Sequence, residues 1–278
     1  MKFQNLLELR GQPSKYQKGT LEIGGLLLLL FLWQILSLIV NKVGILPSPF
    51  IPLQWANGRG ASSVLTSIPE LWYSDMLLKN ILYSLYLNAS GYVIAIAVAL
   101  PIGFAIGLSP IMKGVFNRPI DAIRFLPLTA VTGLFIAWFG IYSQMKILFL
   151  SFSIIVYLIP VVVQRVYEVE NVFVQTIQTL GASKWQTIRK VFIPAVFSKI
   201  IDDIRVLTAI SWTYIVVAEL VNNEGGIGAL SVRAARQGRL DKAFFVLFVI
   251  ILLGILQDKL FVFADKKLCK FKYAQIGK

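Results

Sequence analysis

Few side chains in this sequence are of the kinds that carry out reactions. The chain has no histidine, and its one cysteine, Cys269, stands in a basic C-terminal segment. The usual imidazole base and metal ligand are therefore missing, and neither an internal disulfide nor a thiolate metal site can form. A P-loop requires the order Gly-x-x-x-x-Gly-Lys-Ser/Thr, and the nearest candidate, residues 107–114, departs from it. The sequence thus disfavours hydrolytic enzymes, metalloenzymes and pumps that carry their own ATPase.

Polar residues inside apolar stretches are the remaining candidates, because a charge within a membrane is costly unless it has a partner or water nearby. Arg124 precedes the hydroxyls of Thr129 and Thr132 in one such stretch. A fixed positive charge and hydroxyl donors are groups that bind an oxyanion, so these three residues predict part of an anion route. The alternative is that Arg124 extends to the headgroups at the membrane surface.

Three acidic residues lie in or just before a later apolar stretch, residues 206–221. Glu219 is expected near the outer end of a span, where either a salt bridge to an external arginine or a gating role would explain it. Asp202 and Asp203 lie at helical spacing from Lys199 and Arg205. We expect these two to be solvated charges of small individual energetic value.

The apolar composition places these residues in a membrane protein. Of the 278 residues, 57% are hydrophobic, and the mean hydropathy is +0.73. Six apolar stretches approach the roughly 17–25 residues that cross a bilayer as a helix. They are residues 23–40, 81–108, 125–141, 147–163, 206–221 and 243–264. We therefore predict an all-α integral membrane protein with about six transmembrane helices, in a single domain that covers residues 1–278.

The second apolar stretch contains helix-bending and small residues. Gly91, Pro101, Gly103 and Gly107 recur along it. Such residues allow two helices to approach closely or a helix to kink. We expect close packing against a neighbouring helix, with a hinge on the transport route as the alternative.

The net charge of +13 is distributed unevenly along a six-span chain. Basic residues, among them Lys2, Arg10 and Lys278, are about twice as frequent on the side of the two termini, so the positive-inside rule places both termini in the cytoplasm. The other side holds Arg59 and a basic run made of Arg233, Arg236, Arg239 and Lys242. That run would attract anions, or would bind lipid headgroups or an acidic partner.

A polar, basic segment interrupts the apolar sequence between the fourth and fifth stretches. Ser183 and Gln186 have the spacing of a capping box, which predicts a short helix that begins just after Gly181. Apolar residues then recur on one side at helical spacing, namely Trp185, Ile188 and Val191. This pattern predicts an amphipathic helix that lies along a surface.

The same segment resembles the cytoplasmic signature loop of ABC importer permeases, in which Glu-Ala-Ala, three residues, Gly, nine residues and Ile-x-Leu-Pro follow one another. Gly181 takes the glycine place, and residues 191–194 stand for Ile-x-Leu-Pro. Residues 175–177 read Gln-Thr-Ile, so a carboxylate that the family often presents to its ATPase is absent. The resemblance implies that residues 171–194 form a cytoplasmic coupling loop. This loop would contain a short coupling helix that docks the ATPase. The residues expected to act there are Gln175, Gly181, Ala182, Ser183, Trp185, Ile188 and Pro194.

Two further stretches resemble the nitrate, sulfonate, taurine and bicarbonate group of these permeases. Pro-Leu at 127–128 is followed about ten residues later by Trp-Phe-Gly at 138–140, and Val-Val-Ala-Glu-Leu at 216–220 precedes Gly-Gly-Ile-Gly at 225–228. The resemblance is good over roughly residues 119–228. It adds Trp138 and Glu219 to the residues expected along the translocation path.

The resemblance implies a permease subunit of an ATP-driven importer that moves a small anion, such as nitrate, bicarbonate or a sulfonate, by alternating access. It also implies two cytoplasmic ATPase subunits that bind ATP and magnesium, a second permease copy forming a homodimer, and an extracytoplasmic substrate-binding protein. The protein would lie in a bacterial inner membrane and would contact the lipid around it. We expect no cofactor and no chemistry on this chain, and no nucleic-acid partner.

Three alternatives stand beside this interpretation. The cargo could instead be neutral or zwitterionic, such as a thiamine-precursor pyrimidine or taurine. An ion-coupled secondary transporter would be expected to show internal repeats and charged residues at the membrane midplane, and the sequence has no convincing repeat. A membrane enzyme acting on lipids would need clustered carboxylates or a histidine or serine site, and Asp202 and Asp203 come nearest to one.

Overall fold

The structure is a computed structural model that describes residues 14–42, 44–55, 60–222 and 224–273. Lys2, Arg10, Arg59 and Lys278, which entered the charge argument, lie outside these residues. The described residues form two compact units. Unit one consists of the described parts of Met1–Asp75 and Arg233–Phe245, and unit two of those of Met76–Val232 and Val246–Lys278.

Unit one contains a long apolar helix and a proline-rich excursion. Its elements are α1 (Lys15–Val40), β1 (Leu53–Gln54), β2 (Ala61–Ser62) and α2 (Ile68–Tyr73). The two strands pair antiparallel, with Leu53 opposite Ser62. The indole of Trp33 on α1 donates a hydrogen bond to the carbonyl of Pro47 (3.0 Å), and the Ser48 hydroxyl donates to the amide oxygen of Gln34 (2.9 Å). These bonds hold the excursion to α1.

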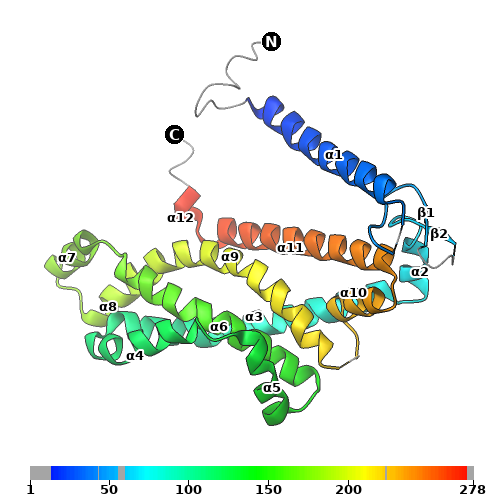
Figure 1. Cartoon of the computed structure of the whole chain (residues 1–278). Coiled ribbons are helices and arrows are strands. Elements are labelled where there is room, and N and C mark those ends of the chain that lie inside the picture. The colour runs from blue at the N-terminus through cyan, green and yellow to red at the C-terminus, as the bar shows by residue number, and fades with distance from the viewer. Residues whose placement is uncertain (1–13, 43, 56–59, 223, 274–278) are drawn as a thin grey trace. The chain divides into compact units, whose positions relative to one another are not determined.

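Unit two is a bundle of helices. Its elements are α3 (Leu77–Leu108), α4 (Pro110–Ile123), α5 (Leu128–Phe139), α6 (Ser143–Tyr167), α7 (Asn171–Thr179), α8 (Lys184–Thr187), the π-helix η2 (Ile188–Phe192), α9 (Ile193–Leu220) and α12 (Lys270–Tyr273). Two helices run from one unit into the other, α10 (Ile227–Arg236) and α11 (Leu240–Leu268). Within unit two, α6 packs against both α3 and α9 (Figure 1). The all-α class is confirmed.

Glycines of α3 let it approach α6 closely. A Cβ atom at Gly103 would lie 2.5 Å from the Cβ of Val162, and one at Gly107 would lie 2.8 Å from the Cβ of Val166. A real Cβ atom does not fit at such distances, so these positions require glycine for space. The expectation of close helix packing is therefore confirmed for this stretch.

Within the described residues, four helices are long and apolar enough to cross a membrane, namely α1, α3, α6 and α11. A fifth span results if α4 and α5 are taken together as one bent pair, because they meet at 102° across a short break. The expected third span, residues 125–141, is thus not a straight helix. Pro127, which precedes α5, has no N–H group to continue a helix, and α5 with 12 residues is only about 18 Å long.

The expected fifth span lies within α9. This helix has 28 residues, which is about 42 Å and long enough to cross the membrane. It is not among the helices that are apolar enough to cross a membrane, because charged residues occur along it: Lys199, Asp202, Asp203, Arg205 and Glu219. Most of these charges have partners on other helices, as described below.

Candidate coupling and transport sites

The segment predicted to dock an ATPase, residues 171–194, consists of α7, a tight turn, α8, η2 and the start of α9. Gly181 ends α7 with φ of +78°, and the N–H groups of Gly181 and Ala182 donate to the carbonyls of Gln178 (2.9 Å) and Ile177 (3.2 Å). This is a Schellman arrangement, which favours glycine because a positive φ is strained for other residues. The predicted turn at Gly181 is confirmed.

The capping box that follows is also confirmed. The Ser183 hydroxyl accepts a hydrogen bond from the N–H of Gln186 (3.3 Å), and the Ser183 N–H donates to the side-chain oxygen of Gln186 (2.7 Å). Both bonds satisfy N–H groups that a helix start otherwise leaves without partners. The helix beginning at Lys184 is therefore fixed by two adjacent local signals.

The apolar side predicted for this helix is not continuous. Trp185 is 66% exposed, whereas Ile188 and Val191 are half-buried. The π-helix η2, in which the Ile193 N–H bonds back to the carbonyl of Ile188, moves the side chains that follow it out of α-helical register. Gln175 is exposed on α7, and Pro194 is half-buried in the first turn of α9. The chain from Lys184 to Leu220 is helical without a break.

In the part of the chain that the structure describes, the three residues expected along the anion route make no hydrogen bond to one another. Arg124 lies beyond the end of α4 and donates to Asp121 (2.8 Å), while Thr129 is exposed on α5. Thr132 is buried, and its hydroxyl has no hydrogen-bond partner among the described residues. Arg124 instead lines a polar cavity of about 280 Å³. The side chains around this cavity belong to Asp121, Arg124, Pro160, Val161, Gln164, Arg165, Glu168 and Asp203.

Trp138 lines an apolar groove. It is 65% exposed on α5 and packs its ring beside Phe135 and Phe139. The groove has a volume of about 690 Å³ and is walled by apolar side chains of α3, α5 and α6, with Ser151 as a polar exception. The Ser151 hydroxyl already donates to the carbonyl of Ile147, so the groove presents little to hold an anion.

Glu219 lies at a buried corner between α9, α3 and the start of α10, and its side chain is fully buried. It accepts hydrogen bonds from the Ser84 hydroxyl (2.5 Å) and from the N–H groups of Gly228 (2.7 Å) and Ala229 (3.4 Å). Its described partners are therefore a hydroxyl and two backbone N–H groups rather than the expected external arginine. A carboxylate suits this place because a helix N-terminus presents unsatisfied N–H groups and a partial positive charge.

Side chains of α3 complete this corner. The Gly226 N–H donates to the Asn80 side-chain oxygen (2.7 Å), and the Ile227 N–H donates to the Ser84 hydroxyl (2.9 Å). A Cβ atom at Gly226 would overlap the carboxylate of Glu219, and one at Gly228 would lie 2.6 Å from the Cα of Val216. The Val-Val-Ala-Glu-Leu and Gly-Gly-Ile-Gly motifs are thus two halves of one structural element. Glu219 does not line an open path here.

Lys146 lies near the start of α6 and is fully buried. Its ammonium group lies 3.4 Å from the Tyr83 hydroxyl, 3.3 Å from the carbonyl of Asn222 and 3.9 Å from the carboxylate of Glu224. These contacts explain how a buried lysine is tolerated next to the Glu219 corner. Sequence reasoning missed it because the partners come from α3 and from the segment between α9 and α10.

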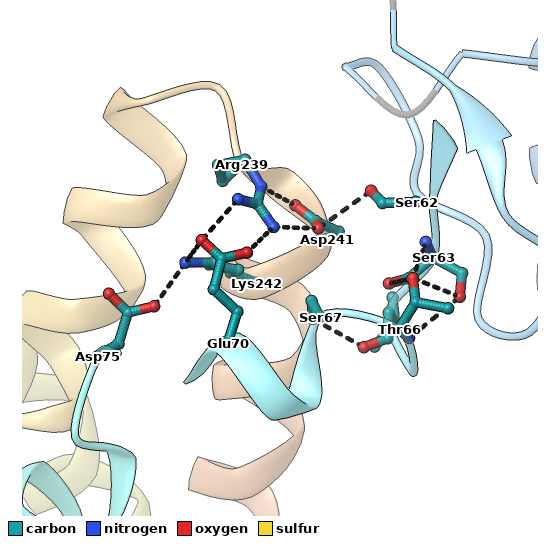
Figure 2. Close-up of polar contacts among 10 residues, drawn as sticks. Ser62, Ser63, Thr66, Ser67, Glu70, Asp75, Arg239, Asp241 and Lys242 are labelled. Atoms are coloured by element: carbon teal, nitrogen blue, oxygen red, sulfur yellow. Dashed lines mark hydrogen bonds and ion pairs between the residues drawn. The ribbon is translucent and has the colours of Figure 1, made fainter. Parts of the chain in front are cut away.

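Two of the four members of the basic run expected to attract anions, Arg239 and Lys242, are paired with carboxylates within unit one (Figure 2). Arg239 donates to both carboxylate oxygens of Glu70 (3.0 and 2.7 Å) and to Asp241 (3.1 and 3.0 Å). Lys242 bonds to Glu70 and Asp75, at 2.6 Å each. Three carboxylates thus surround two basic groups.

Further polar contacts tie this cluster to its surroundings. Ser62 on β2 donates to Asp241 (3.1 Å). The bond from Arg239 holds the pKa of the Glu70 carboxyl at about 2, below its ordinary value of 4.5. From the predicted basic run, Arg233 and Arg236 remain as exposed side chains.

One of the two aspartates of α9 differs from expectation. Both were predicted to be solvated charges. Asp202 is 47% exposed and pairs with Arg205 at the expected helical spacing (3.2 Å) as well as with Lys272 on α12. Asp203, in contrast, bonds to Arg165 on α6. The side chain of Asp203 is only 16% exposed. The spacing within α9 could not reveal partners that lie on α6 and α12.

Comparison with known proteins places this architecture in a family. Residues 91–269 match the family described as binding-protein-dependent transport system inner membrane component. The match includes the predicted docking segment, Glu219 and the Gly-Gly-Ile-Gly motif at 225–228.

Individual relatives carry related names. The chain is 27% identical over 280 residues to the putative aliphatic sulfonates transport permease protein SsuC of Bacillus subtilis, covering 98% of this chain and 95% of that protein. It is 29% identical over 211 residues to the taurine transport system permease protein TauC of Escherichia coli, covering 75% and 74%.

The fold is similar to that of a solved transporter. An inward-facing structure of the MetNI methionine ABC transporter superposes with a TM-score of 0.59 at 17% identity, covering 73% of this chain and 97% of that one. Family membership implies an ATPase and a substrate-binding protein as partners. The chain therefore belongs to the binding-protein-dependent transport system inner membrane components and is the permease subunit of an ABC importer, in which a separate subunit hydrolyses ATP.

Proposed function

We propose that this permease imports a small sulfonate-type anion and that residues 171–194 dock its ATPase. Two copies of the chain form the path, two ATPase subunits bind to the two docking segments, and both termini lie on the ATPase side of the membrane. ATP and magnesium bind to the ATPase subunits. Closure of these subunits draws the docking segments together and changes which side of the path is open.

The observation that carries the docking proposal is the exposed Trp185 on a rigidly capped turn. An exposed tryptophan flanked by Lys184, Arg189 and Lys190 is suited to a protein interface, since tryptophan is enriched among the residues that dominate binding energy. Gly181 and Ser183 fix the direction in which this side chain is presented. The alternative is that Trp185 lies in the lipid interface as an aromatic anchor.

The cargo proposal rests on similarity along nearly the whole chain to a sulfonate permease. Arg124, Thr129 and Thr132 remain the residues proposed for the anion route. Because Arg239 and Lys242 are paired with carboxylates, Arg233 and Arg236 are the members of the basic run that could draw anions to the entrance. A neutral or zwitterionic cargo is the second candidate, and the relative named for taurine transport favours keeping it.

The test is uptake by the complex reconstituted in liposomes with its ATPase and binding protein. Nitrate, bicarbonate, an alkyl sulfonate, taurine and a thiamine-precursor pyrimidine are compared in wild type and in Arg124→Gln. We expect saturable uptake of the sulfonate and a weaker transport of it by Arg124→Gln. Saturable uptake of the neutral pyrimidine alone, unaffected by the substitution, would contradict the anion proposal and leave the importer assignment intact.

A further inference from the structure

Three neighbouring side chains of α9 each bond to a different helix of unit two. Asp203 accepts two hydrogen bonds of 2.7 Å from Arg165 on α6. Arg205 donates to both carboxylate oxygens of Asp258 on α11, at 2.8 and 3.2 Å. Asp202 accepts from Lys272 on α12 at 2.6 Å. Asp202, Asp203 and Arg205 are called the α9 clamp below.

The bond to α6 has the geometry of a strong pair. Exposed ion pairs contribute little, but a bidentate arginine–carboxylate pair fixes direction as well as distance. The side chains of Arg165 and Asp203 are 29% and 16% exposed, and a further nitrogen of Arg165 donates to Glu168 at 2.7 Å. The guanidinium is thus held on two sides, so α6 and α9 are fixed relative to one another at this level.

The clamp is mechanically continuous with the docking segment. From Lys184 through η2 to Leu220 the chain is helical, with no loop that could absorb a displacement. Asp203 lies ten residues beyond the start of α9 at Ile193, a distance of about 15 Å along the helix axis. Figure 1 shows α8 leading directly into α9 at one end of this unit. A movement of Trp185 and its neighbours can therefore reach the clamp along one continuous helical element.

We infer that the α9 clamp is the point where movement of the docking segment is passed from α9 to α6 and α11. Arg165 and Asp203 act as positioning residues for energy coupling. This inference rests on the proposed docking function of residues 171–194. A purely structural clamp would instead affect how much complex assembles, with each assembled complex working normally.

The test is a double-mutant cycle with near-isosteric neutral side chains, Arg165→Gln, Asp203→Asn and the two combined. The reconstituted full complex is assayed for bound ATPase, for ATP hydrolysis and for cargo uptake per ATP hydrolysed. Each single variant should keep its ATPase and lower uptake per ATP about tenfold, within the range typical of coupling between sites. In the double variant, uptake per ATP should also be lowered about tenfold and no further, because both substitutions break the same interaction.

Control variants make the cycle specific. Lys267→Gln removes an exposed positive charge near the end of α11 and should leave uptake per ATP unchanged. Arg165→Lys keeps the charge but loses the forked pair, and should lower the ratio by a smaller factor even if Arg165→Gln assembles poorly. Normal uptake per ATP in assembled single variants, loss of the bound ATPase, or losses that multiply in the double variant would each overturn the clamp proposal.

Failure of the docking proposal gives a different result. If Gly181→Asp retains its ATPase and full uptake, residues 171–194 do not dock the ATPase. The clamp cycle still reports whether α6 and α9 are coupled in that case, because it is measured on complexes that already contain the ATPase.

Discussion

The docking segment and the Glu219 corner use polar groups in opposite ways, although both belong to unit two. In the docking segment, polar and aromatic side chains such as Trp185 and Gln175 are exposed around a turn fixed by Gly181. At the corner, Glu219 is fully buried and accepts bonds from Ser84 and from backbone N–H groups of α10. The docking segment is held by its own local hydrogen bonds and leaves side chains exposed for a partner. At the corner, the polar groups bond to one another in the interior.

Mutations in these two regions should therefore have different effects. A residue of the corner should affect folding, because its partners are buried and cannot turn to water. A residue of the docking segment should affect binding, because the helix start is secured by its own capping box. The predictions below separate these two effects.

The largest effect is expected for Glu219→Ala. It leaves buried N–H groups without an acceptor, at a cost of about 1–3 kcal/mol for each group. The melting temperature of the purified complex should fall sharply. It should fall less for Glu219→Gln, which keeps an acceptor oxygen. Glu170→Ala is the matched control, since Glu170 is exposed and its side chain makes no capping hydrogen bond at the start of α7. Equal melting of Glu219→Ala and wild type would mean that the corner does not stabilise the fold.

The second effect is expected for Gly181→Asp, compared with Gly181→Asn. Both side chains meet open space, because no atom lies within 4 Å of a Cβ built at this position. Both also tolerate a positive φ better than most residues, so they differ mainly in charge. We expect Gly181→Asp to insert in the membrane but to shed or uncouple the ATPase, and Gly181→Asn to retain more coupling. Co-purification of the ATPase and substrate-stimulated hydrolysis measure this, and wild-type values for Gly181→Asp would refute the docking assignment.

The same contrast explains what could be predicted from sequence. The docking segment depends on local signals, such as the spacing of Ser183 and Gln186 and the glycine after α7, so its turn and helix start were predicted correctly. The small residues of α3 were likewise visible as a series, because helix contacts recur along one stretch.

Contacts between distant residues were not predictable in this way. Ser84 and Glu219 are 135 positions apart, and Arg165 and Asp203 are 38 apart, so no local pattern pairs them. The actual partners of Glu219, Lys146 and Asp203 therefore could not be identified from the sequence. The bend before α5 had a visible cause in Pro127, but its angle of 102° depends on tertiary packing.

A smaller effect is expected when the proposed apolar anchor of the docking segment is removed. Trp185→Ala combined with Ile188→Ala should weaken ATPase binding by about 2 kcal/mol or more, the scale of an interface hot spot. Thermal stability of the permease should change little, because Trp185 is largely exposed. A cross-linker placed at position 185 should react with the ATPase. Reaction with lipid and never with the ATPase would identify Trp185 as a membrane anchor.

The smallest effect extends the comparison to unit one, where Glu70 is half-exposed and yet paired with charges. Because Arg239 lowers the pKa of Glu70 to about 2, the ionised carboxylate stabilises unit one above pH 4.5, and this contribution is lost as the pH falls from 4.5 toward 2. Glu70→Gln should therefore reduce the melting temperature slightly at pH 7, and its difference from wild type should shrink as the solution is acidified. The measurement is thermal unfolding of both proteins between pH 7 and pH 3. A constant difference across this range would show that the charge of Glu70 contributes nothing to stability.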